Sequence, residues 1–328
     1  MKPVLVVDIS HAFWTTALGM HADRVAIPYV LKDIRQLQKD YDAVIICPDS
    51  ATGTPWRRAE CPEYKVKKND QRTAEQWEAL GMLIDDCRAR GWHVVEPPEH
   101  PRYPGHYYEA DDVIRTVALT VSASGQPVDV LSGDSDLAML VDDEAGIRYL
   151  RRHKGGVAPM VADDIERWLG TIPSMAVEVK ALAGDDDGYK PFPGIGPTGA
   201  LALLNALPSG YTRSAKGVVE HTLTNGVPKN KDGKTESQAY RAIHDGGLRA
   251  VEFGYRMARP CDDVPIQLDL SRPPSPAPSR SVKAPPPQES TESRLTRLES
   301  LVRAQADRIA SLESAMAGGA GFEGDYRQ

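Results

Sequence analysis

Three short apolar runs, each ending in an aspartate, constrain this chain more than any other feature of its sequence. The runs are residues 3–8, 43–49 and 127–134. Nearly continuous apolar runs of this length are typical of strands buried on both faces of a parallel sheet. Helical patterns alternate with them, near 28–39, 73–90 and 109–124. This alternation predicts an α/β fold with a mostly parallel sheet flanked by helices.

The aspartates at the ends of these runs are Asp8, Asp49 and Asp134. In an open α/β sheet, ligands bind beyond the carboxyl ends of the strands. We therefore expect these three side chains to meet at one edge of the sheet.

The sequence changes character near residue 160. Helical patterns then follow one another, at 161–170, 173–184, 198–206, 212–224 and 235–256. We predict a sheet lobe at 1–160 and a helical lobe at 161–265 that docks on it. The proline- and serine-rich stretch 271–290 indicates an extended linker. Apolar residues at heptad spacing predict a short coiled coil at 291–317.

Further acids gather in three clusters. The clusters are Glu109-Ala-Asp111-Asp112 at the start of an amphipathic helix, Asp134-Ser-Asp136 after a predicted strand, and Gly184-Asp185-Asp186-Asp187-Gly188. Each alone has an ordinary explanation: acids favoured at a helix N-terminus, an Asx turn, or a solvated loop. Together in one cleft they would repel one another and raise one another's pKa values, unless cations neutralised them.

The acids therefore predict a metal centre. The predicted ligands are Asp8, Asp49, Glu109, Asp111, Asp112, Asp134, Asp136, Asp185 and Asp187. All of them offer oxygen, which selects hard ions such as Mg²⁺ or Mn²⁺. Two such ions can activate water and stabilise the leaving oxygen of a phosphodiester, so we predict two.

The net charge of −7 at first argues against a nucleic-acid partner. Setting aside the nine predicted ligands turns −7 into +2, so the charge does not exclude DNA. The four cysteines have no metal spacing, and no apolar run is long enough for a membrane helix, so we expect a cytoplasmic protein. The histidines, His11 among them, show no ligand spacing and are assigned no role.

Five sequence blocks follow one another between about residue 2 and residue 256. They are VLVVDISHAFW, CPDSATGTPWRRAECPEYKVKKNDQRT, EADDVI, SGDSDLAMLV and LAGDDDGYKPFPGIGPTGALALL. This order resembles the 5′–3′ exonuclease/flap endonuclease family, which includes phage 5′ nucleases and the N-terminal exonuclease domain of bacterial DNA polymerase I. The resemblance implies a PIN-like fold, a helix–three-turn–helix element in the helical lobe, and a helical arch near 55–72.

The resemblance also implies roles for single residues. Asp8, Asp111, Asp112 and Asp134 would hold the metal nearer the chemistry, and Asp136, Asp185 and Asp187 the second one, partly through waters. Lys65 would stabilise the scissile phosphate, with support from Arg57. The implied DNA contacts are Tyr64, which would stack on a base, the basic residues Lys67, Lys68 and Arg72 of the arch, and Gly194, Ile195, Gly196 and Thr198 at a glycine turn.

The last acidic block departs from the family pattern because it is one residue shorter. Either Asp186 or Asp187 could therefore be its second ligand, and the Asp-Gly-Tyr sequence that follows Asp186 favours Asp187.

The sequence thus predicts a metal-dependent 5′–3′ exonuclease or flap endonuclease of replication or repair, of the kind that phages encode. Its substrate would be DNA with 5′ ends or flaps, or RNA–DNA primer junctions. The alternatives are a PIN-like ribonuclease and a catalytically inert DNA-binding or scaffold protein of the same fold. The coiled coil would self-associate or bind a replication partner.

Overall fold

The computed structural model describes residues 1–20, 23–50, 53–66, 72–153, 156–185, 188–229 and 235–271. All of them lie in one compact unit that runs from Met1 to Pro278. The predictions that fall outside the described residues concern Lys67, Lys68, Asp186, Asp187, the coiled coil at 291–317, and the linker beyond Ser271. No helix in the described part of the chain is long and apolar enough to span a membrane.

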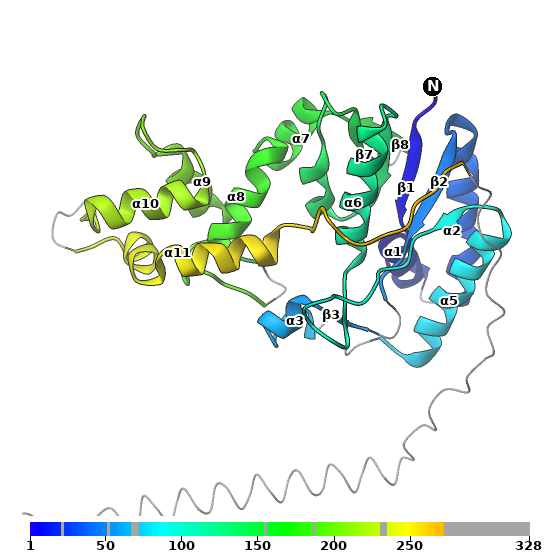
Figure 1. The fold of residues 1–328 in the computed structure, drawn as a ribbon, viewed down its shortest axis with the longest axis horizontal. Coiled ribbons are helices and arrows are strands. Elements are labelled where there is room, and N and C mark those ends of the chain that lie inside the picture. Colours follow the sequence, from blue (N-terminus) through cyan, green and yellow to red (C-terminus); the bar gives the residue numbers. More distant parts are fainter. Residues whose placement is uncertain are drawn as a thin grey trace, which may run out of the picture. The chain divides into compact units, whose positions relative to one another are not determined.

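Among the described residues, six strands form one sheet in the order β4–β2–β1–β6–β7–β8 (Figure 1). They are β1 (Val4–Asp8), β2 (Ala43–Cys47), β4 (His93–Val94), β6 (Val128–Leu131), β7 (Ile147–His153) and β8 (Gly156–Met160). The strands pair in parallel except for β7 and β8 at one edge. The predicted α/β fold with a mostly parallel sheet is confirmed.

Helices cover both faces of this sheet (Figure 1). They are α1 (Ile9–Met20), α2 (Asp23–Leu37) and α5 (Ala74–Ala89) on one face and α6 (Ala110–Ala123) on the other. Leu5 and Val7 join the core under the first three helices, whereas Val4 and Val6 join the core under α6. Side chains alternate along a strand, so β1 is buried on both faces and its end is fixed firmly.

From Ala162 onward the described elements are helices with a core of their own. They are α7 (Ala162–Leu169), α8 (Pro173–Ala183), α9 (Pro197–Asn205), α10 (Ala215–Asn225) and α11 (Gln238–Ala258). Leu182, Phe192 and Leu204 are buried in that core. Each helix predicted between 161 and 256 is therefore present, within a few residues of its predicted bounds.

One segment joins the sheet and the helices. It begins with β3 (Thr54–Pro55), which pairs with β5 (His106–Tyr107), and continues through α3 (Arg57–Glu60). Tyr64 then packs in a small apolar cluster with Tyr189 and Met257. Residues 55–66 belong to the predicted arch, but here they are packed into the fold rather than free above it.

After α11 the chain returns along the sheet lobe (Figure 1). Val264 is buried against the core under α6, and Ile266 and Leu268 pack beside it. The backbone N–H of Val264 also donates to Thr116 Oγ1 on α6, at 3.3 Å. The end of the helical lobe is thereby tied to the sheet lobe.

Candidate active site

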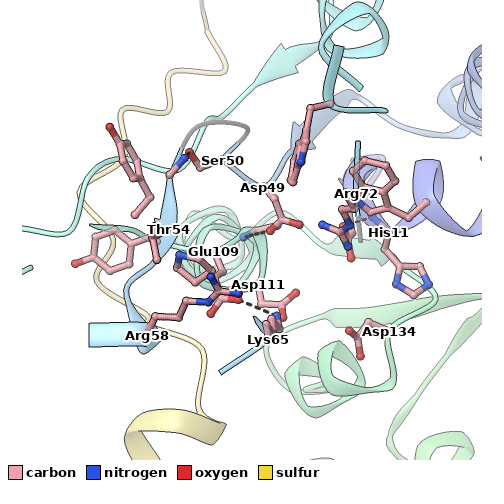
Figure 2. Close-up of a pocket in the computed structure, with 18 of the residues that line it drawn as sticks. His11, Asp49, Ser50, Thr54, Arg58, Lys65, Arg72, Glu109, Asp111 and Asp134 are labelled. Atoms are coloured by element: carbon pink, nitrogen blue, oxygen red, sulfur yellow. Dashed lines mark hydrogen bonds and ion pairs between the residues drawn. The ribbon is translucent and has the colours of Figure 1, made fainter. Parts of the chain in front are cut away.

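A cavity of about 470 Å³ opens beside the carboxyl ends of β1, β2 and β6 (Figure 2). The acids that line it are Asp8, Asp49, Glu109, Asp111 and Asp134. The basic side chains that line it are Arg58, Lys65 and Arg72. The three strand-end aspartates thus meet at one edge of the sheet, as the sequence predicts.

Asp8 is the last residue of β1 and only 4% exposed. One carboxylate oxygen accepts from the backbone N–H of His11 (3.0 Å) and the other from Ser132 Oγ (2.8 Å). Burial raises the pKa of Asp8 to about 7, and the charge of Asp49 adds to this effect. A charged Asp8 is therefore unfavourable unless a cation lies close by.

Two further acids face the cavity from the start of α6 and from the end of β2. Asp49 Oδ1 accepts from the backbone N–H of Ala110 at 3.2 Å, which places the helix N-terminus beside β2. Burial raises the pKa of Asp111 well above its usual range, and the charge of Asp134 adds to this. None of Asp8, Asp49, Asp111 and Asp134 forms an ion pair with a lysine or arginine in the described part of the chain; we call these four the pocket acids.

Asp112 does not line the cavity, so the geometry does not favour its predicted role as a metal ligand, which stays a prediction. Its side chain is fully buried, and Arg57 donates to both of its oxygens, at 2.8 and 3.0 Å. Trp56 Nε1 and the backbone N–H groups of Glu109 and Cys261 also donate to it, at 2.8–3.0 Å. These five donors take up the lone pairs of the carboxylate, so none remains for an ion.

Arg57 is likewise a structural residue: it does not line the cavity, and its predicted support of Lys65 stays a prediction. It is 3% exposed. Besides Asp112, it donates to Glu109 Oε2 (2.5 Å) and to the carbonyl oxygens of Met257 (3.1 Å) and Arg259 (3.0 Å). Its guanidinium donors are engaged, so it cannot turn toward a phosphate.

Glu109 lines the cavity, but its carboxylate is already balanced by the chain. Glu109 Oε1 accepts from Lys65 Nζ at 2.7 Å and from the hydroxyl of Tyr64 at 3.4 Å. Burial acts to raise the pKa of Glu109, yet the charges of Lys65 and Arg57 outweigh it and lower this pKa. Tyr64 is 6% exposed within the apolar cluster, so its burial does not favour stacking on a base, and that role stays a prediction.

Lys65 reaches the cavity wall with 24% of its side chain exposed. Burial would lower the pKa of its ammonium group, but the carboxylate of Glu109 raises it, so Lys65 stays charged. That Lys65 stabilises the scissile phosphate stays a prediction, and its position at the cavity wall is compatible with this role.

A second cavity of about 540 Å³ shares Asp134 with the first and holds the later acids. Lys180 Nζ donates to Asp136 Oδ2 and, at 2.5 Å, to Asp185 Oδ2. Burial raises the pKa of Asp136 even though Lys180 opposes it. We call Glu109, Asp112, Asp136 and Asp185 the paired acids. The sequence analysis missed Lys180, although it stands in the last turn of the helix that leads into the acidic loop.

Other cavity residues come from α1 and α5. The guanidinium of Arg72 lies 4.3 Å from the ring centroid of Trp14 and 5.4 Å from that of Trp77. All three line the first cavity, as does His11. The sequence analysis missed both tryptophans and His11; the signal was that His11 and Trp14 lie three and six residues beyond Asp8, on the helix that directly follows β1.

The predicted glycine turn lies at the start of α9. Gly194 has φ +86° and is exposed, as are Gly196, which caps the helix, and Thr198. Ile195 is only 4% exposed, and its N–H donates to the carbonyl of Phe192 at 3.2 Å. The turn can therefore offer Gly194, Gly196 and Thr198 to a partner, but neither the side chain nor the N–H of Ile195.

The pocket acids suit a divalent ion by their chemistry rather than by a closed geometry. No group of three His, Cys, Asp or Glu side chains among the described residues lies close enough together to enclose an ion. The carboxylates instead surround a cavity with room for water, and small hard ions keep several waters when bound. The raised pKa values of Asp8 and Asp111 show that negative charge here lacks compensation.

The fold and this site define a class: an α/β protein with a carboxylate-lined cavity at the carboxyl ends of a parallel sheet. Residues 11–167 match the family described as 5′–3′ exonuclease, N-terminal resolvase-like domain. A 5′–3′ exonuclease of Streptomyces coelicolor is 30% identical over 229 residues, which cover 66% of this chain and 73% of that protein. The chain belongs to the 5′–3′ exonuclease family.

DNA polymerase I of Chloroflexus aurantiacus is 33% identical over 248 residues, which make up 74% of this chain. The chain spans only 23% of the length of that polymerase.

Two solved structures of bacteriophage T5 proteins share the fold. One is a 5′-exonuclease with bound divalent metal ions (zinc), with a TM-score of 0.61, 16% identity, and coverage of 78% of this chain and 88% of that one. The other is a flap endonuclease in a pseudo-enzyme–product complex with DNA and metal ions, with a TM-score of 0.57, 16% identity, and coverage of 79% and 88%. The predicted 5′-nuclease fold is confirmed.

Proposed function

We propose that this protein is a divalent-metal-dependent 5′–3′ exonuclease and flap endonuclease that hydrolyses DNA phosphodiesters in replication or repair. The observation that carries the proposal is the convergence of the four pocket acids on one cavity, with the ammonium of Lys65 at its wall. The proposal includes strands that contain RNA at a primer junction.

The pocket acids would hold the metal, with Mg²⁺ or Mn²⁺ favoured by a donor set made only of oxygen. A bound divalent ion supplies a water of lowered pKa and positive charge for the leaving oxygen. Asp136 and Asp185 would serve a second ion, which has to displace Lys180 from between them. The metal ions in the two bacteriophage T5 structures support this assignment.

The residues of this chain would bind and orient the nucleic acid. Lys65 would approach the scissile phosphate from the cavity wall and stabilise the negative charge that develops in the transition state. Arg58 and Arg72 line the same cavity and suit neighbouring phosphates. The exposed start of α9 would contact the duplex backbone, which gives affinity without sequence specificity.

The test is cleavage of a 5′-flap DNA labelled at its 5′ end, with Mg²⁺ and with EDTA, for the parent protein and for Asp134→Ala. We expect metal-dependent cutting near the flap junction that Asp134→Ala abolishes. Binding without cutting in either Mg²⁺ or Mn²⁺ would instead support an inert DNA-binding protein. Cutting of RNA alone would support the PIN-like ribonuclease.

The tail is a separate proposal that rests on its sequence alone. Heptad spacing at 291–317 would let two copies associate, or let one copy bind a replication partner. Removing residues 290–328 should change the solution mass or the bound partner and leave cleavage intact; an unchanged mass together with unchanged partners would reject the idea.

A further inference from the structure

The carboxylate of Glu109 is shared among donors of the chain itself. Lys65 and Tyr64 donate to one oxygen, and Arg57 donates to the other at 2.5 Å. The side chain is 5% exposed. Although Glu109 lines the cavity, both of its oxygens thus already serve positively polarised groups.

Lys65, which donates to Glu109, has an unusual backbone conformation. Lys65 has φ +52° and is the only non-glycine residue with positive φ among those described. A β-carbon disfavours this region, and such residues persist where the surroundings fix them. Arg58 Nε donates to the carbonyl of Tyr64 at 2.7 Å, which secures the peptide that precedes Lys65. This backbone conformation therefore directs the side chain of Lys65 into the cavity.

Arg57, which donates to the other carboxylate oxygen of Glu109, is held firmly in place. Arg57 is clamped by two hydrogen bonds to Asp112 and by the carbonyl oxygens of Met257 and Arg259. Both Arg57 and Asp112 are almost fully buried. The position of the Glu109 carboxylate is therefore set by a fixed cation behind it, and Glu109 in turn fixes the ammonium in front.

We propose that Glu109 is a positioning residue for Lys65 rather than a metal ligand, with the Arg57–Asp112 pair as its anchor. The proposal rests on the proposed function, because it concerns the same site. Glu109 holds the Lys65 ammonium at the cavity wall and away from Asp111, whose carboxylate lies near enough to feel the charge of Lys65. The lysine is thereby kept available for phosphate, and Asp111 is kept available for metal.

A cycle of Glu109→Gln, Lys65→Met and the double variant tests this. A residue that acts only through another adds nothing once that other is gone. We expect Glu109→Gln to lower kcat by about 10–100-fold, as for other residues that orient a catalytic group, with a much smaller change in KM. In the Lys65→Met background, Glu109→Gln should change kcat by less than about twofold.

Metal binding gives a readout that does not depend on activity. Mn²⁺ affinity, measured by electron paramagnetic resonance in the Lys65→Met background, should be unchanged by Glu109→Gln and weakened at least about tenfold by Asp111→Asn. A tenfold loss of Mn²⁺ affinity on Glu109→Gln, or a further tenfold loss of kcat in the double variant, would overturn the proposal and restore Glu109 as a ligand.

Two further variants keep the test interpretable. Glu109→Asp retains the negative charge that Arg57 needs but withdraws the oxygens from Lys65, so it should lower kcat in the same direction if Glu109→Gln does not fold. Glu178→Gln is the matched control, because Glu178 is a half-buried glutamate on α8 that binds the Ala215 N–H and the Tyr255 hydroxyl away from the cavity; its kcat should be that of the parent. If the parent protein itself does not cut flap DNA in Mg²⁺, the proposed function fails, and this is seen before any variant is compared.

Discussion

The pocket acid Asp111 lies within two residues of the paired acids Glu109 and Asp112, yet the two kinds of acid differ in what balances their charge. Asp111 faces the cavity, and burial raises its pKa. Glu109 and Asp112, on either side of it in the sequence, bind Lys65 and Arg57, and their pKa values are lowered. A carboxylate balanced by its own protein contributes to folding, whereas one left unbalanced awaits a ligand. An acidic motif can therefore combine both kinds within one helical turn.

Loss of a pocket acid should have the largest effect. Asp111→Asn removes a carboxylate that forms no ion pair with a lysine or arginine among the described residues, so cleavage of flap DNA should fall by more than about 100-fold, beyond the loss expected for a residue that only supports a ligand. Single-turnover cleavage at saturating Mg²⁺ measures this. Activity of the variant within tenfold of the parent would contradict the idea that the pocket acids, unlike the paired acids, hold the metal.

Loss of a paired acid should act first on stability. Asp112→Ala leaves Arg57 buried with only Glu109 to balance it, and breaking a buried ion pair costs about 3–5 kcal/mol. Urea unfolding in EDTA measures the change in the free energy of unfolding. Asp134→Ala is the control, because it removes an acid without orphaning a cation, and its free energy of unfolding should change by less than about 1 kcal/mol.

Asp8, a pocket acid, and the paired acids Glu109 and Asp112 should also respond oppositely to pH. The pKa of Asp8 in the folded state, about 7, lies above its ordinary value of 3.8, so the folded state binds this proton more tightly than the unfolded state. Metal-free protein should therefore lose stability as the pH rises from about 4 to about 7, by up to roughly 1.4 kcal/mol per unit. The paired acids Glu109 and Asp112 have lowered pKa values, so their contribution is present above their ordinary pKa and is lost as the pH falls.

The variant Asp8→Asn isolates the contribution of Asp8 to the pH dependence of stability. In EDTA, the variant should gain stability over the parent at pH 7 and little at pH 4, as measured by urea unfolding at both pH values. An equal change at both would show that Asp8 is not held protonated by its surroundings.

The smallest effect is expected at Lys180. Lys180→Met would remove the ammonium group that pairs with Asp136 and Asp185, and because these ion pairs are only part-buried the stability in EDTA should fall by about 1 kcal/mol or less. Added Mg²⁺ should restore more stability in the variant than in the parent, because an ion no longer competes with the ammonium group. Equal restoration in both would mean that Lys180 does not occupy an ion's place.

The sequence was sufficient to predict a mostly parallel sheet, the strands β1, β2 and β6, and the convergence of their aspartates, because these follow from buried strands that end in acids. It does not predict α1, which starts at Ile9 directly after β1 with no turn residue between them. Nor does it indicate the edge strand β8, which pairs antiparallel with β7. Local patterns carry little information about elements defined by their pairing partner.

What the sequence could not predict about the site has one physical origin. Glu109, Asp111 and Asp112 look equivalent in the sequence, and so do the basic residues near 57–65. Which acid meets which cation depends on Arg57, whose partners lie 52 to 202 residues away. Such long-range pairing leaves no periodic signal. In the structure, Arg57 and Asp112 are almost fully buried, whereas Lys65 keeps 24% of its side chain exposed at the cavity.

The contacts of Arg57 with Met257 and Arg259 have a consequence for how this protein is made. They join parts of the chain that are 200 and 202 residues apart, and the N–H of Cys261 reaches Asp112 across 149 residues. Contacts so distant in sequence form late. A nascent chain would carry its acids long before it carries the groups that set their geometry. The active site would then form only after α11 has been synthesised and has packed against the sheet lobe, so an incomplete polypeptide would not cleave nucleic acid.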